Sequence, residues 1–220
     1  SNSILAGFKA LSAGVGAIGA GAYVSVSNSS FDYGTAVVWN NPAQLQITNS
    51  NFYLADISAG QTLPMLGLTI GNVMISNCFF NSSSTRAGRA IIDYTPDASG
   101  IFSNYSLSVT NSTFNHEGGT ALEAAPMNLN VGAAALLTAN INNNDFYRRG
   151  AVAYSKGLVN VANAGYLSMT VQGNTFLQDA GATGHWIAID NDGPYFIGGN
   201  VFNSTLTSSY PAVRVQGTYQ

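Results

Sequence analysis

Short alternations of apolar and polar residues recur along the chain, and each is followed by the same motif ending in phenylalanine. Val or Ile stands five positions before each of these phenylalanines, and a second apolar residue usually stands two positions earlier. A spacing of two places both side chains on one face of a strand, so the pattern predicts strands with one buried face. The copies are VSNSSF (26–31), ITNSNF (47–52), ISNCFF (75–80), VTNSTF (109–114), INNNDF (141–146), VQGNTF (171–176) and IGGNVF (197–202).

The copies are unevenly spaced, since Phe52 follows Phe31 by 21 residues whereas Phe114 follows Phe80 by 34. A constant core with variable insertions is typical of a solenoid. With the phenylalanines stacked inside, the sequence predicts an all-β, single-stranded right-handed parallel β-helix of about seven coils. A second strand of each coil is expected at 35–39, 89–93, 120–124, 151–154, 186–190 and 212–215. Long loops are expected after Gly60 and at 81–88, 94–105, 125–137 and 155–166.

The position three residues before each phenylalanine is asparagine in five copies and glycine in the last two. Both residues tolerate a positive φ, so we expect a left-handed bend between two strands there. These residues are Asn28, Asn49, Asn77, Asn111, Asn143, Gly173 and Gly199. Stacked from coil to coil, the asparagines are expected to form an amide ladder. The following position is always small, and we interpret Cys78 there as a structural substitute for serine, because no basic residue beside it would lower its pKa.

The Asn-Ser and Asn-Asn pairs followed by Phe resemble the pectate-lyase-like superfamily of right-handed parallel β-helices, over about residues 22–217. The resemblance implies a fold and leaves the activity open, because the superfamily includes polysaccharide lyases and hydrolases, phage tailspikes and adhesins. Similarity to the lyases would imply acidic calcium ligands with a catalytic Arg or Lys, and similarity to the hydrolases would imply several aspartates with a Gly-His-Gly motif. Here Trp186 follows Gly184 and His185. Asp190 and Asp192 have no second acidic coil beside them, so neither signature is complete.

The segment 1–21 is expected to be a cap or an assembly segment before the β-helix domain at 22–220. Ser3 can cap a short helix there. The apolar face of this helix would consist of Ile4, Leu5, Phe8 and Leu11. At the other end, nothing after the strand at 212–215 predicts a cover for the last coil. Because bare strand edges pair with other chains, we expect either that the chain is a piece of a longer protein or that another copy covers this edge in a homo-oligomer or polymer.

Only 8% of the 220 residues are charged, against roughly 25% in a typical soluble domain. Such an uncharged surface favours an extracellular, cell-surface or virion-surface protein. Seven Lys and Arg residues form no basic patch for nucleic acid, and no membrane contact is expected. No metal cluster or cofactor is predicted, and Cys78 has no partner for an intrachain disulfide. Four further polar residues are interpreted as solvated loop residues, namely His116, Glu117, Arg148 and Arg149.

Candidate chemistry lies on the outer side of the second sheet. If Ile187 and Ile189 point inward, alternation sends the residues between and beside them outward. In-register stacking would then place Glu123, Ala153, Ala188 and Arg214 in one outer row. Exposed rings stack on sugars, and paired carboxyls act as general acid and base. The candidates are therefore Asp190, Asp192 and Glu123 for catalysis, and Trp186, His185 and Arg214 for carbohydrate binding.

Two functions follow from these patterns. The first is a non-enzymatic structural or adhesive β-helix that self-assembles with copies of itself into a fibre, sheath, spike or surface layer. The low charge, the bare last edge and the incomplete catalytic signatures favour it. The alternative is a polysaccharide-binding or polysaccharide-cleaving protein, such as a lyase, a glycosidase or a phage tailspike.

Overall fold

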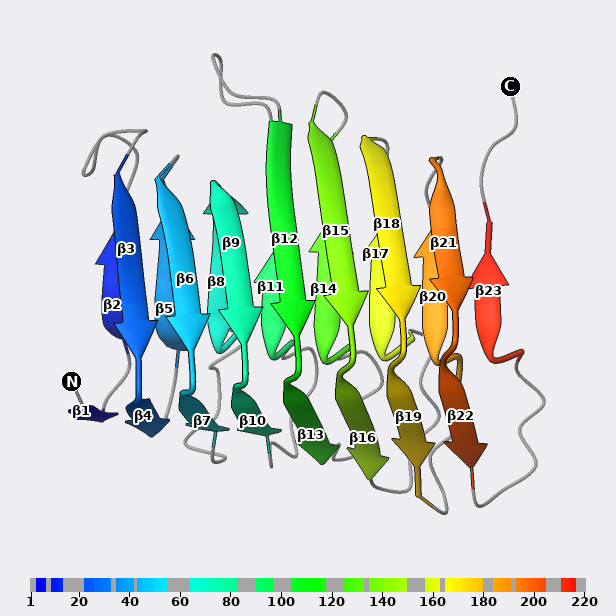
Figure 1. Cartoon of the computed structure of the whole chain (residues 1–220), viewed down its shortest axis with the longest axis horizontal. Coiled ribbons are helices and arrows are strands. Elements are labelled where there is room, and N and C mark those ends of the chain that lie inside the picture. Colours follow the sequence, from blue (N-terminus) through cyan, green and yellow to red (C-terminus); the bar gives the residue numbers. More distant parts are fainter. Residues whose placement is uncertain are drawn as a thin grey trace, which may run out of the picture.

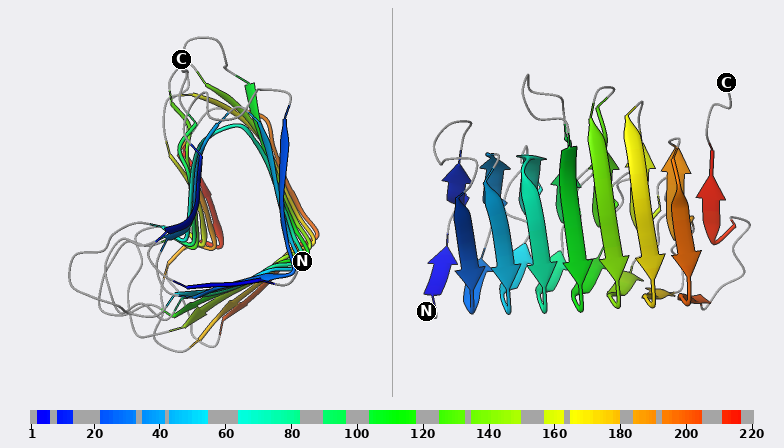
Figure 2. Two further views of the ribbon diagram at one scale, coloured as in Figure 1. Left: turned by 90° about the vertical axis from the view of Figure 1, so that its left-hand side faces the viewer. Right: turned by 45° about the horizontal axis from the view of Figure 1, so that its top comes forward.

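The computed structural model shows an all-β parallel solenoid, which confirms the predicted class of fold (Figure 1). Viewed along its axis, the strands superimpose as three sides of a coil (Figure 2, left). No helix occurs among the described residues. These residues are 3–6, 9–13, 22–32, 35–41, 43–54, 64–82, 90–96, 104–117, 125–132, 135–149, 157–162, 165–179, 184–190, 193–204 and 211–216.

Three sheets, which we name A, B and C, run along the solenoid, and every described strand pair is parallel. Sheet A contains β1 (Ser3–Ala6), β4 (Ser29–Asp32), β7 (Asn51–Leu54), β10 (Phe79–Ser82), β13 (Thr113–Glu117), β16 (Asp145–Arg149), β19 (Thr175–Gln178) and β22 (Val201–Ser204). Sheet B contains β2 (Lys9–Ala13), β5 (Thr35–Asn40), β8 (Leu66–Ile70), β11 (Ile92–Tyr94), β14 (Met127–Asn130), β17 (Val159–Ala162), β20 (Ile187–Asp190) and β23 (Val213–Val215). Sheet C contains β3 (Tyr23–Ser27), β6 (Gln44–Thr48), β9 (Asn72–Ser76), β12 (Asn104–Thr110), β15 (Leu136–Asn142), β18 (Tyr166–Gln172) and β21 (Tyr195–Gly198).

The motif phenylalanines stack face to face through the interior beside sheet A, as predicted. Neighbouring ring centroids lie 4.6 to 5.2 Å apart, and neighbouring planes differ by 3° to 14°. All but Phe202 at the last strand are buried. Burying each ring contributes roughly 2 kcal/mol, so this stack is a principal source of stability.

The bend between sheets C and A is left-handed in every copy, which confirms the prediction. The five asparagines have φ between 49° and 56°, and Gly173 and Gly199 have φ of 66° and 63°. The predicted amide ladder, however, forms one position later. The left-handed asparagines are exposed, whereas the small residue after each points inward.

The ladder at this later position joins side chains to the backbone of the preceding coil. Asn144 N and Nδ2 both donate to Asn174 Oδ1, at 2.8 and 3.1 Å. Asn174 bonds to Asn200 in the same way, at 2.9 and 3.0 Å. Ser112 Oγ accepts a bond of 3.1 Å from Cys78 N. In the earlier coils a serine hydroxyl therefore takes the place of the asparagine side chain as the acceptor. The ladder therefore satisfies turn amides that are buried at each corner.

The prediction of a helix near the N-terminus is wrong. Ser3–Ala6 and Lys9–Ala13 are the strands β1 and β2, which pair with β4 and β5. An open sheet edge offers unpaired backbone groups to any adjacent segment, and pairing with that edge competes with helix formation.

The second strand of each coil was only partly predicted. β5, β11, β20 and β23 overlap the expected ranges, but sheet B continues through β8, β14 and β17. The last two lie in stretches that were expected to be loops. The alternative ranges 120–124 and 151–154 lie outside the described residues.

Candidate functional site

Sheet B carries a row of mostly polar side chains on its outer face, and the register of five strands builds this row. Asp93 pairs with Asn128, and Asn128 pairs with Asn160. Asn160 pairs with Ala188, and Ala188 pairs with Arg214. We call these five residues the sheet B outer row.

The first part of the row is a chain of hydrogen bonds that ends on a carboxylate. Asn160 Nδ2 donates to Asn128 Oδ1 over 2.9 Å, and Asn128 Nδ2 donates to Asp93 Oδ1 over 2.9 Å. Asn160 is buried although it stands on the outer side of the sheet. This direction of donation orders the amides, and the bond from Asn128 stabilises the charged form of Asp93.

The other end of the row is an ion pair. Arg214 Nη2 donates to Asp190 Oδ2 over 2.8 Å, and the two side chains are 28% and 41% exposed. Asp190 sits two residues beyond Ala188, the strand neighbour of Arg214, so the pair bridges β20 and β23 diagonally. Partly exposed pairs of this kind contribute about 0 to 1 kcal/mol, and this one ties the last strand to its neighbour.

The predicted outer row was therefore only partly correct. Ala188 and Arg214 do stack in register, as expected. Glu123, Ala153 and Asp192 lie outside the described residues. In the coils of Glu123 and Ala153 the row is occupied by Asn128 and Asn160. Among the candidates, Asp190 and Arg214 are brought together.

Trp186 and His185 do not point outward as expected. Trp186 is 6% exposed and packs its ring at 6.3 Å from Phe176 and 6.2 Å from Phe202, tilted by 60° and 46°. His185 is buried, and its Nδ1 donates to the carbonyl of Pro211 over 2.9 Å. Strand alternation begins at Ile187, so it does not extend to the bend before it. Neither ring is available to stack on a sugar.

The two carboxylates on the described strands of sheet B are too far apart to act as a catalytic pair. β11 and β20 are three strand spacings apart, so Asp93 and Asp190 are separated by about 14 Å along the sheet. Glycoside hydrolases need their two carboxyls within about 5 to 9.5 Å. Each of these carboxylates is also bonded to a neighbouring side chain. The described part of sheet B therefore holds an ordered and partly buried polar row, in which Asn160 and Ala188 are buried, and it does not hold an acid and base pair.

A second polar row was missed from the sequence and lies inside the solenoid. Ser82, His116, Arg148 and Gln178 pair along sheet A and are all buried. The interpretation of His116 and Arg148 as solvated loop residues is thus wrong. Each stands two residues after a motif phenylalanine and shares its inward face, which is the signal that could have revealed the row.

The described residues contain no group of three or more His, Cys, Asp or Glu side chains that could hold a metal ion. They also form no helix that could cross a membrane. Comparison of the chain with protein-family models, with curated proteins and with solved structures found no match.

Proposed function

We propose that this chain is a non-enzymatic structural or adhesive element of a cell or virion surface, which joins copies of itself end to end. In this proposal the solenoid is a right-handed β-helix in which each of the seven motif copies makes one coil. Figure 1 supports this handedness, because the near strands of sheet C descend and the far strands of sheet B ascend as the chain advances from left to right.

The observation that carries the proposal is the incomplete burial of apolar side chains at the two ends of the solenoid. Two inward rows of apolar side chains run the length of sheet C. In its inner strands these side chains are at most 2% exposed, as for Leu45, Ile47, Met169 and Val171. At the ends the same rows are only partly buried, at Val24 and Val26 of β3 and at Tyr195 and Ile197 of β21. A further strand at either end would complete their burial.

Both ends are open, and sheets A and B extend one strand beyond sheet C. Stacking two copies end to end therefore brings β22 and β23 of one copy beside β1 and β2 of the next, and leaves β21 and β3 two strand spacings apart. Phe202 and Val213 at the last strands of the other two sheets are also only partly buried. Strand edges and half-buried apolar rows favour addition of a parallel strand. Joining the last coil of one copy to the first coil of another makes a heterologous contact, which does not close and builds a filament.

No observation on the described residues favours the alternative of polysaccharide cleavage. Asp190 is paired with Arg214, Trp186 is buried, and Asp93 lies about 14 Å from Asp190. The low charge of the chain supports a surface location in the proposal, because an uncharged and rigid polar exterior suits proteins exposed outside cells.

A disulfide across the proposed junction tests its geometry. If the coils continue in register, Val201 of one copy lies beside Ile4 of the next, since both belong to the same row of sheet A. Cα atoms on adjacent strands are about 4.8 Å apart, within the range that a disulfide spans. The variant combines Ile4→Cys and Val201→Cys with Cys78→Ser. Under oxidation we expect a ladder of covalent oligomers on a non-reducing gel.

The matched control moves one cysteine by two residues. In Ala6→Cys with Val201→Cys, also without Cys78, the diagonal separation is about 8 Å, which exceeds the reach of a disulfide. Within one copy the paired positions are seven strand spacings, or about 34 Å, apart, so an internal disulfide cannot form. A ladder in the first variant and not in the second supports the proposal. No ladder in either, or equal ladders in both, would overturn it.

A further inference from the structure

The outer face of sheet C is uncharged over its whole described extent. The seven strands contain no Asp, Glu, Lys or Arg. The outward positions are mainly Ser, Thr, Asn and Gln, such as Ser106, Ser108 and Thr110 of β12, and all are at least partly exposed. No described segment lies over this side of the coil (Figure 2, left). The face is thus a broad, flat array of hydroxyl and amide groups.

Within the described strands, the charged side chains lie on the other two sheets. Sheet A carries Asp32, Asp145 and Arg149 on its strands, and sheet B carries Asp93, Asp190 and Arg214. Sheet C therefore differs from sheets A and B in having no charged residue on its strands. Hydroxyl and amide groups can hydrogen-bond an uncharged ligand, whereas a charged ligand would find no opposite charge on this face.

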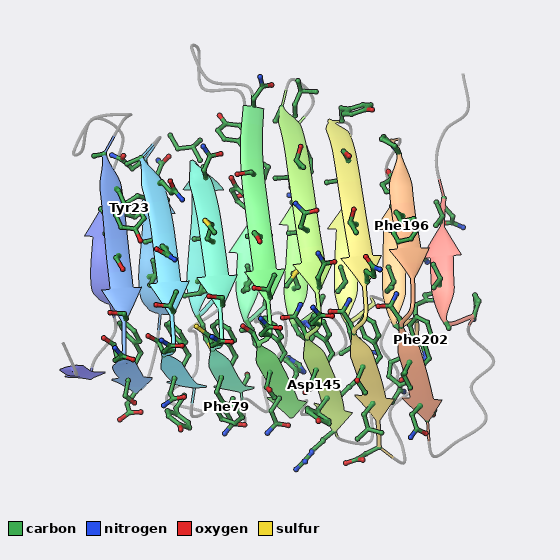
Figure 3. All side chains as sticks on the ribbon, viewed as in Figure 1. Tyr23, Phe79, Asp145, Phe196 and Phe202 are labelled. Atoms are coloured by element: carbon green, nitrogen blue, oxygen red, sulfur yellow. The ribbon has the colours of Figure 1, made fainter. Side chains whose placement is uncertain are left out.

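Aromatic rings stand exposed on the same face. Tyr23, Tyr166 and Phe196 are 54%, 50% and 56% exposed. Figure 3 shows Tyr23 and Phe196 on the near side of the molecule at opposite ends of sheet C. β3 and β21 are six strand spacings apart, so these two rings span about 29 Å. A long ligand lying along the solenoid axis can contact both.

Side chains of the face are linked from coil to coil. Ser106 Oγ donates to Asn72 Oδ1 over 2.9 Å, and Gln44 Nε2 lies 3.1 Å from Met74 Sδ. The strands repeat every 4.8 Å or so, so each row presents one polar group per coil at a regular interval. Short side chains held on a rigid sheet lose little entropy when a ligand binds.

We propose that the outer face of sheet C binds a neutral polysaccharide chain that runs along the solenoid axis. Successive sugars would exchange hydrogen bonds with successive coils, while the apolar faces of some sugar rings stack on the exposed aromatic side chains. A polyanion is disfavoured because the face offers no cation, and a basic partner is disfavoured because it offers no carboxylate. The inference does not depend on end-to-end assembly, since the junction involves strand edges and this site is a sheet face.

Affinity electrophoresis in native gels tests the proposal. The probes are neutral hydroxyethylcellulose, mannan and starch, with polygalacturonate as an anionic comparison. We expect retardation of the wild type by at least one neutral polymer and none by polygalacturonate. Tyr166→Ala should weaken that binding about fivefold, because it removes one stacking ring.

Tyr53→Ala is the matched control, because Tyr53 is a similarly exposed tyrosine, 40%, on the outer side of sheet A. This variant should bind as the wild type does, and circular dichroism should show that both variants fold. Absence of retardation by any neutral probe would overturn the proposal. So would binding of polygalacturonate alone, or equal weakening by the two tyrosine substitutions. These outcomes are distinguishable from failure of the cross-link, which reports on the junction alone.

Discussion

Cys78 occupies a ladder position that other coils fill with serine or asparagine. It is 3% exposed, and its Sγ lies 3.3 Å from the carbonyl of Ser76. Ser50 and Ser112 donate to equivalent carbonyls over 2.8 and 2.9 Å. Burial raises the pKa of the Cys78 thiol from 9.0 to about 11. The thiol is therefore a packed neutral group.

This raised pKa gives a dependence of stability on pH. The folded chain keeps the proton of Cys78 between about pH 9 and 11, whereas the unfolded chain loses it, so stability falls as pH rises through this range. The loss attributable to Cys78 should approach about 2 to 3 kcal/mol. Urea unfolding of the wild type and of Cys78→Ser at pH 8, 9.5 and 11 measures it as the difference between the two slopes with pH. Parallel behaviour of the two proteins, or rapid alkylation of the native thiol at pH 8, would contradict the burial described here.

The bend between sheets C and A joins two strands at a single left-handed residue. Asn77 has φ of 52° and an exposed side chain, so its role is conformational. Asn77→Ala should destabilise the protein by roughly 1 kcal/mol, since alanine pays the left-handed penalty in full. Asn77→Gly should cost less than about 0.5 kcal/mol, because glycine adopts this conformation freely.

Urea denaturation of both variants checks this order. Asn51→Ala is the control, because Asn51 is also exposed but lies in the extended strand β7; it should resemble the wild type. Equal stabilities of the alanine and glycine variants at position 77 would show that the bend does not depend on a left-handed residue.

The strands and bends near the motif could be predicted, because period-two alternation and tolerance of positive φ are local properties. Other elements depend on neighbours that the local pattern does not contain. β1 and β2 are strands because sheet edges receive them. β14 and β17 alternate as well, with Met127 and Leu129 inward, but the runs at 120–124 and 151–154 predict strands on the same local grounds.

The candidate site was predicted less well, for the same physical reason. Ile187, Ile189 and the pairing of Ala188 with Arg214 followed from alternation and register. Trp186 did not, because it precedes the strand and turns into the space between Phe176 and Phe202. Arg148 is fully buried, and its inward direction was visible only from its even spacing to Phe146.

At the scale of the whole molecule, the interior repeats and the exterior does not. The stacked rings and the ladder use the same positions in coil after coil, so they specify the solenoid and carry no information about a partner. What varies is the set of outer faces and the two ends. The uncharged face of sheet C and the half-buried rows at β3 and β21 are the features that separate this chain from a generic solenoid.

Sedimentation velocity over a rising concentration series, with the wild type beside Val213→Lys, tests end-to-end growth most directly. Val213 belongs to the half-buried inward row at the terminal strand β23, and a lysine there would have to be desolvated in the junction. Thr170→Lys, on the outward face of sheet C, controls for the added charge. We predict that the wild type and the control grow into larger species as concentration rises, while Val213→Lys sediments as a single chain. A wild type that remains a single chain at the highest concentration would contradict end-to-end assembly.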